Sequence, residues 1–176
     1  MDTNRSGENR LDSSNLPTLK VGTAYKIKCF RNGEVVWTED TTNKVVNTGL
    51  EYILGTAFGD VEQVDMYCGL CSRAGVLPED TMSEHQFDEF IGTSNVERSL
   101  AVFESGGVVN NKAVYIATDV QSFVFTEGGL RGIFLTDNKM VGSNTGLLFG
   151  VAPFSEEKVV IPGDSLLVEI TISAEG

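Results

Sequence analysis

Hydrophobic and polar residues alternate with a period of two along most of this chain, most clearly near its end. Between residues 165 and 173 every second residue is aliphatic, so one face of the segment is apolar. Similar short runs, bounded by turn-forming residues, cover residues 64–70, 96–103, 113–118, 122–126, 130–135 and 146–151. No crossover helices separate them. The pattern predicts an all-β fold, an antiparallel, jelly-roll-like β-sandwich.

The first half predicts a hairpin followed by one short helix. Residues 25–30 alternate, Asn32-Gly33 suits a type I′ turn, and residues 34–38 form the returning strand. Residues 48–51 have the spacing of a capping box. The apolar residues that follow share one helical face, which we expect to pack on one side of the β core: Leu50, Ile53, Leu54 and Ala57. We expect the helix to end near Gly55 or Gly59, and residues 71–93 to be irregular, with a helical turn around 83–90.

Residues 1–20 are polar and show neither a strand nor a helix period. We therefore divide the chain into a flexible N-terminal arm, 1–20, and a β-sandwich domain, 21–176. The arm is either a frayed terminus or a tether that lies along a neighbouring subunit through Leu11, Leu16 and Leu19. No stretch has the length and apolarity of a signal peptide or a membrane helix, so we expect a chain made in the cytoplasm, without a membrane partner.

Charge narrows the range of partners. The chain of 176 residues has 13 Lys and Arg against 25 Asp and Glu, a formal net charge of −12. Such a charge repels phosphate backbones and anionic lipids, which argues against direct binding of nucleic acid. It also keeps a protein soluble when many copies are displayed together. The 10 Phe residues predict an aromatic core, in which we place Phe123, Phe125, Phe134, Phe149 and Phe154.

Three cysteines and one histidine are the candidate metal ligands. Cys68 and Cys71 have CxxC spacing, and with Cys29 and His85 they offer four ligands for tetrahedral zinc. A strand, however, places Cys68 and Cys71 on opposite faces, and no second close pair follows. We therefore favour small, reduced, buried thiols, and expect no metal and no cofactor.

No arrangement typical of catalysis accompanies His85. It lies in an acidic segment with Glu84, Asp88 and Glu89, without a nucleophile motif and without the spacing of a calcium loop. The glycine-rich stretches lack the lysine of a phosphate-binding loop. We interpret His85 as a surface residue in a solvated acidic loop and expect the protein not to be an enzyme.

The order of several motifs resembles a group of small virion proteins of tailed bacteriophages. The resemblance covers roughly residues 34–174, and its motifs are structural rather than catalytic. They lie at residues 34–37, 43–54, 66–70, 80–85, 123–125, 130–136, 145–149 and 159–168. The chain departs from the group at Cys68 and Cys71, where residues without thiols are usual.

The resemblance implies a structural protein of the virion: a cement or decoration protein that binds the outside of the capsid and bridges major capsid proteins. Partners would be the major capsid protein and copies of the chain itself, as a dimer or trimer. We expect contacts through the arm and two loop tips, with these residues: Leu11, Leu16, Leu19, Val108, Val109, Asn110, Val141 and Asn144. A tail adaptor or fibre-anchoring protein is the alternative. A carbohydrate-binding sandwich that stacks sugars on Trp37 is a more distant one.

Overall fold

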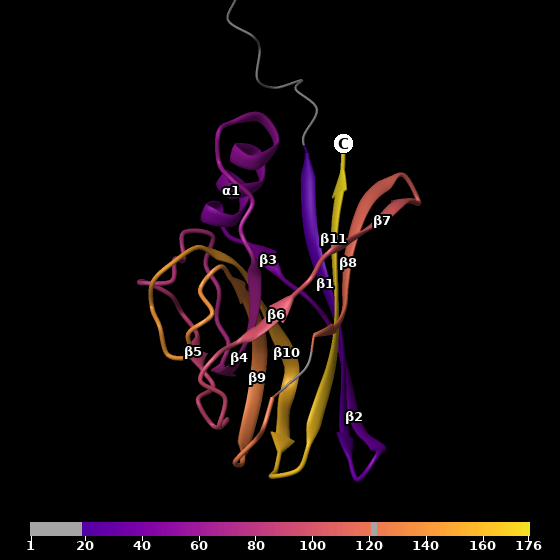
Figure 1. Ribbon diagram of the computed structural model, residues 1–176, viewed down its shortest axis with the longest axis vertical. Coiled ribbons are helices and arrows are strands. Elements are labelled where there is room, and N and C mark those ends of the chain that lie inside the picture. Colours follow the sequence, from indigo (N-terminus) through magenta and orange to yellow (C-terminus); the bar gives the residue numbers. More distant parts are fainter. Residues whose placement is uncertain (1–18, 121–122) are drawn as a thin grey trace, which may run out of the picture.

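A computed structural model describes residues 19–120 and 123–176 of the chain. In these residues two antiparallel sheets lie face to face, with one helix, α1 (Asn47–Phe58), beside one end of the sandwich (Figure 1). The predicted all-β, two-sheet antiparallel sandwich with one short helix is confirmed. The arm, with Leu11 and Leu16, lies outside the described residues apart from Leu19 and Lys20.

The first sheet has five strands in the order β2-β1-β11-β8-β7. Its strands are β1 (Lys20–Arg31), β2 (Glu34–Thr42), β7 (Glu104–Val109), β8 (Lys112–Val120) and β11 (Ser165–Glu175). Strands from the two ends of the chain meet in the middle, where β1 and β11 pair from Lys20 and Glu175 to Phe30 and Ser165. Alternation along β11 gives the predicted apolar inner face, since Leu166, Val168 and Ile170 are buried.

The second sheet has six strands, in the order β3-β10-β9-β4-β5 with β6 also paired to β4. Its strands are β3 (Lys44–Val45), β4 (Met66–Arg73), β5 (Asp88–Glu89), β6 (Ser99–Ala101), β9 (Gly128–Thr136) and β10 (Leu148–Val160). The predicted central strand is β4, which pairs with β5, β6 and β9. Because β4 is covered on both faces, its sequence is almost continuously apolar.

Two hydrophobic clusters form the core. The larger fills the space between the sheets and includes four of the predicted core aromatics, among them Phe123, Phe125 and Phe149. The smaller contains Cys71, Phe87 and Phe134 and lies against the segment that follows β4. Phe154 belongs to the larger cluster, so all five predicted core phenylalanines are buried.

The predicted first hairpin is confirmed, and Asn32 and Gly33 both have the positive φ that a type I′ turn requires. Jelly-roll connectivity is not confirmed. In a jelly roll successive strands mostly alternate between sheets, whereas here β1–β2, β7–β8 and β9–β10 are neighbours within one sheet.

The predicted start of α1 is wrong, and of the four residues predicted on its buried face only Ile53 packs against the core, Ala57 being exposed. The helix begins at Asn47, and its N-cap residue is Val46, whose side chain has no hydrogen-bond acceptor. The Thr48 hydroxyl lies inside the helix and donates to the Leu148 carbonyl (2.7 Å). Leu50 and Leu54 are exposed, whereas Tyr52 and Ile53 pack against the core. The predicted end is right, since the last helical residue precedes Gly59.

Other differences concern the loops. No helical turn forms at residues 83–90, where the short strand β5 lies instead. The predicted strand at 96–103 is regular only in β6, and the expected loop tip with Val108, Val109 and Asn110 is the end of strand β7 and a two-residue turn. In the predicted strand at 122–126, the described part forms one isolated bridge, between Phe125 and Thr93.

Candidate functional site

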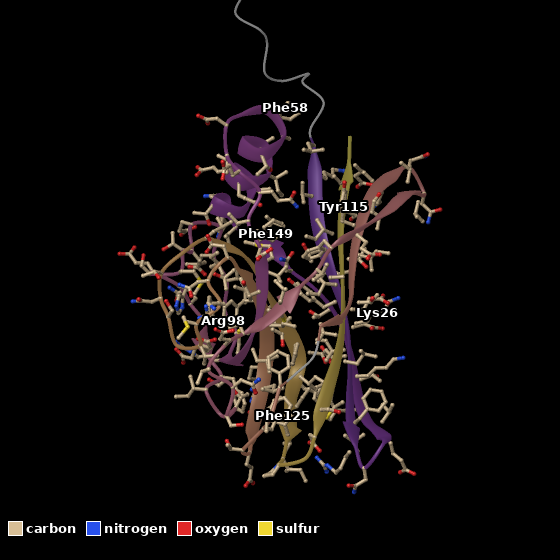
Figure 2. The ribbon with its side chains drawn as sticks, in the orientation of Figure 1. Lys26, Phe58, Arg98, Tyr115, Phe125 and Phe149 are labelled. Atoms are coloured by element: carbon tan, nitrogen blue, oxygen red, sulfur yellow. The ribbon has the colours of Figure 1, made fainter. Side chains whose placement is uncertain are left out.

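The outward face of α1 carries a row of apolar side chains. Leu50, Leu54 and Phe58 are spaced four residues apart, so they lie above one another on the helix surface. Their exposed fractions rise along the helix, from 38% through 50% to 85%. We call these three residues the apolar stripe. Phe58 stands at the outermost part of the molecule in Figure 2.

The opposite face of α1 fixes the helix against β10. Gly49 is buried, and a Cβ at this position would overlap the backbone of Phe149. The backbone N–H of Val46 and the hydroxyl of Thr48 donate to the carbonyls of Phe149 and Leu148. These contacts set the rotation of the helix about its axis, and that rotation turns the apolar stripe outward.

An apolar groove runs between α1 and the first sheet. It has a volume of about 260 Å³ and is lined mainly by Tyr52, Ile53, Phe103, Tyr115, Phe149 and Ile172. Tyr115 belongs to β8, on the side of the groove opposite the helix, and is 52% exposed. The Tyr52 hydroxyl accepts a hydrogen bond from the Val64 N–H (3.0 Å), which holds the chain leaving α1 along one edge of the groove.

Several predicted contact residues belong to this same end of the sandwich. The start of β1, the end of β11 and the β7–β8 turn all lie at the end where α1 is placed (Figure 1), which we call the helix end. Leu19 precedes β1, while Val108, Val109 and Asn110 form the tip of the β7–β8 hairpin. Val108 is 76% exposed, and Asn110 and Asn111 supply the positive φ values of the turn.

Val141 and Asn144 lie elsewhere. They belong to the β9–β10 connection, which is fastened to β5 rather than to the helix end. The buried Arg98 guanidinium forms two hydrogen bonds to the Glu89 carboxylate (2.8 and 2.9 Å) and donates to the Ser143 carbonyl. Glu89 also accepts from the Gly142 N–H, so the expected solvated acidic loop is wrong for this residue. The predicted contact residues therefore divide into two separate surfaces.

Exposed acidic side chains lie in α1 and in the segment that follows it. Glu51 lies within α1, and Asp60, Glu62 and Asp65 are exposed in the segment after it. None of these four pairs with a basic side chain in the described part of the protein. The helix end thus combines an apolar row with unpaired acidic groups, which favours a partner whose apolar surface is flanked by basic groups.

The three thiols are all buried, as predicted. Cys68 belongs to the cluster between the sheets and Cys71 to the smaller cluster, so the strand places them on opposite faces. Burial, together with the nearby Asp164 carboxylate, raises the pKa of Cys29 to about 12, and burial also raises the pKa values of Cys68 and Cys71. Protonated thiols of this kind are poor nucleophiles and poor metal ligands.

His85 is half-buried and stacks on the Phe87 ring, with ring centroids 3.9 Å apart. Its Nδ1 lies 2.8 Å from the Phe87 carbonyl oxygen, and this contact fixes the orientation of the ring. Within residues 19–120 and 123–176, no three His, Cys, Asp or Glu side chains gather as a metal site would require. Trp37 packs partly against the core and donates to the Val159 carbonyl, so part of its ring is buried.

The apolar stripe is the candidate functional surface that the sequence interpretation missed. Leu50 and Leu54 had been assigned to the core because they match a helical period, and Phe58 was not singled out. One usable signal was Gly49, since a helical glycine often marks a close approach to another backbone.

No helix in the described part of the chain is long and apolar enough to cross a membrane. No protein-family model, no curated protein and no solved structure matches this chain.

Proposed function

We propose that this chain is a structural protein of a tailed-bacteriophage particle, a cement or decoration protein that binds the outside of the capsid and bridges major capsid proteins. The order of motifs that resembles small virion proteins supports this function. The observation that carries it is the apolar stripe: three large side chains in register on a fixed helix, turned toward solvent. Exposed apolar rows of this kind are typical of protein interfaces.

The proposed contact is a helix laid into a groove. The usual anchors of that recognition mode recur every three or four residues on one helix face, and the stripe recurs every four. Burial of Leu50, Leu54 and Phe58 in a partner contributes roughly 25 cal/mol per Å² of apolar surface, before the costs of association. The unpaired acids of the helix end then select a partner with basic groups at the rim. A modest contact suffices, because the capsid lattice repeats it many times.

The proposal also covers cofactors, other partners and self-association. The protein acts without a cofactor, without an enzymatic step and without nucleic acid or membrane, and associates with copies of itself as a dimer or trimer. The tip of the β7–β8 hairpin, with Val108, Val109 and Asn110, lies at the same end of the sandwich and provides a second contact surface (Figure 1).

A binding experiment tests the surface. We expect a Leu54→Glu, Phe58→Glu double variant to cosediment with capsids that lack the protein at least about tenfold more weakly than the unaltered chain, because both anchors are lost. The matched control is Val35→Glu, Val36→Glu, since these residues are exposed apolar ones in the β1–β2 hairpin at the other end (Figure 1). Equal binding of the two double variants would exclude the stripe as the capsid contact.

The copy number in purified particles tests the class of protein. A cement protein is present in a number comparable to that of the major capsid protein. A tail adaptor or fibre anchor is present in the few copies of a single ring. Quantitative mass spectrometry of virions separates the two, and a low count would replace the cement function by the tail function.

A further inference from the structure

The lining of the apolar groove is rich in aromatic rings. Four of its residues are aromatic, and they come from α1, from the chain just before β7, from β8 and from β10: Tyr52, Phe103, Tyr115 and Phe149. Tyr115 is 52% exposed, so apolar ring surface is open to solvent in the groove. The groove, at about 260 Å³, is smaller than the roughly 300–1,000 Å³ of sites that hold small molecules, and its size suits one large side chain.

The residues next to the lining residues in the chain carry acidic groups and no basic ones. Three exposed carboxylates directly precede lining residues, namely Glu51, Glu62 and Asp65, and a fourth, Glu104, directly follows one. No lysine or arginine lines the groove or stands next to a lining residue in the chain. Within residues 19–120 and 123–176, none of the four carboxylates forms an ion pair.

The segment that follows α1 holds two of these carboxylates close to the groove. Its residues Gln63 and Met66 line the groove, and the Val64 N–H donates to the Tyr52 hydroxyl (3.0 Å). Glu62 and Asp65 are exposed within the same segment. Each is adjacent in the chain to a lining residue, and charges act over about 8 Å at physiological ionic strength. The negative charge of this segment therefore acts on a group that enters the groove.

We propose that the groove is the docking site for a large apolar side chain of a partner protein, carried on a segment with lysine or arginine on both sides of it. The aromatic lining receives the apolar side chain, because removal of apolar surface from water favours binding. The basic groups stay at the mouth, where they meet the unpaired carboxylates. A second copy that docked by its own helix end is disfavoured, since it would bring the same acids against them.

The inference deepens the proposed function and rests on it for the identity of the partner, the major capsid protein. The groove and the apolar stripe share no residue, because Leu50, Leu54 and Phe58 do not line the groove. The binding chemistry of the groove can therefore be measured on the isolated chain, without capsids and without involvement of the stripe.

Peptide titration of the full chain tests the groove. The probe is a pentapeptide blocked at both ends, Arg-Gly-Phe-Gly-Arg, and binding is followed by the backbone amide NMR signals of the isotopically labelled protein. We expect the signals of Ile53 and Ile172 to shift, because both residues line the groove, and the signals of the β1–β2 turn to stay unchanged. A peptide with glutamate in place of both arginines should bind at least about threefold more weakly.

A double variant assigns the charge preference to the groove. We expect Glu62→Gln, Asp65→Asn to bind the arginine peptide at least about threefold more weakly than the unaltered chain, because two carboxylates at the mouth are lost. The matched control is Glu34→Gln, Asp40→Asn, which removes two exposed carboxylates of β2 that form no ion pair among the described residues and should leave binding unchanged. Equal binding by the two double variants would overturn the inference.

Other results would overturn it as well: no shift at millimolar peptide, shifts confined to residues away from the groove, or equal binding of the arginine and glutamate peptides. Shifts of the groove signals on dilution without peptide would also overturn it, because they would assign the groove to a second copy. Peptide binding in a protein that does not bind capsids would remove the proposed function and support the docking chemistry. Capsid binding without peptide binding would do the reverse.

Discussion

At the scale of single residues, an ion pair between Arg31 and the buried Asp164 carboxylate joins β1 to the turn before β11. Asp164 has no exposed side-chain surface and receives two hydrogen bonds from the Arg31 guanidinium, at 2.8 and 2.9 Å. It also accepts from the Ile161 N–H and so shapes the turn before β11. The bonds from Arg31 are the main reason why the pKa of Asp164 is lowered. One carboxylate thus joins the end of β1 to the start of β11.

We expect Asp164→Asn to lower the free energy of unfolding by about 2 kcal/mol at neutral pH, because Arg31 loses its buried partner. The folded carboxyl has a pKa below its unfolded value of about 4, so it contributes stability above that pH and loses it as the pH falls through the folded pKa. Urea unfolding should therefore show a smaller loss of stability on acidification in the variant than in the unaltered chain.

The control for this prediction is Asp88→Asn, which breaks an exposed pair with Arg73. It should cost less than about 0.5 kcal/mol, as exposed ion pairs contribute little. Equal losses in the free energy of unfolding from the two substitutions would show that the burial of Asp164 does not increase the contribution of its ion pair to stability.

Burial also determines the chemistry of the thiols. A maleimide reacts with the thiolate, and the pKa of Cys29, about 12, leaves almost none of it at about pH 8. We expect Cys29, Cys68 and Cys71 to remain unlabelled in the folded protein and to react in urea. An added exposed cysteine, Thr38→Cys, should react quickly under the same conditions. Labelling of the native thiols at the rate of Cys at position 38 would contradict the buried core described above.

At the scale of elements, α1 shows what local sequence decides and what tertiary contacts decide. The helix itself and its end at Gly59 follow from periodicity and a glycine. Its rotation depends on Gly49 against the Phe149 backbone, about 100 residues away in sequence. No periodicity within α1 encodes that contact, so the apolar face that it presents to solvent was assigned to the core.

We expect Gly49→Ala to lower the free energy of unfolding by about 2 kcal/mol or more, since its Cβ would overlap the Phe149 backbone and push the helix off β10. Helix propensity alone predicts the opposite sign, a gain of up to about 1 kcal/mol. Thermal unfolding decides between them. Glu51→Ala, on the exposed face, is the control and should change stability by less than about 0.5 kcal/mol.

Contacts with distant residues explain why two predicted loop tips behave differently. The β7–β8 turn uses Asn110 and Asn111 and projects from the first sheet, as expected for an exposed tip. The β9–β10 connection is held by Arg98, a residue without a turn or period signal in the sequence. Val108 and Val109 were thus predictable as exposed, whereas the fastening of residues 141–144 required knowledge of a contact made over about 45 residues.

At the scale of the whole molecule, side chains lock β2 of one sheet against β10 of the other. The buried Glu39 carboxylate accepts from the Ser155 N–H and hydroxyl and pairs with Lys158 (3.1 Å). Thr41 donates to the Pro153 carbonyl on the same strand. Side-chain contacts thus join the two sheets where β2 meets β10. At the helix end a groove lies between α1 and the first sheet. The helix end therefore carries both the groove and the apolar stripe.

The most direct test of the account is a cryo-electron microscopy map of the intact particle that carries this protein. The account predicts many copies of the sandwich on the outside of the capsid, each with α1 against a major capsid protein and Leu54 and Phe58 buried in the contact. Copies confined to the tail, or a capsid-bound sandwich whose helix end points into solvent, would contradict it.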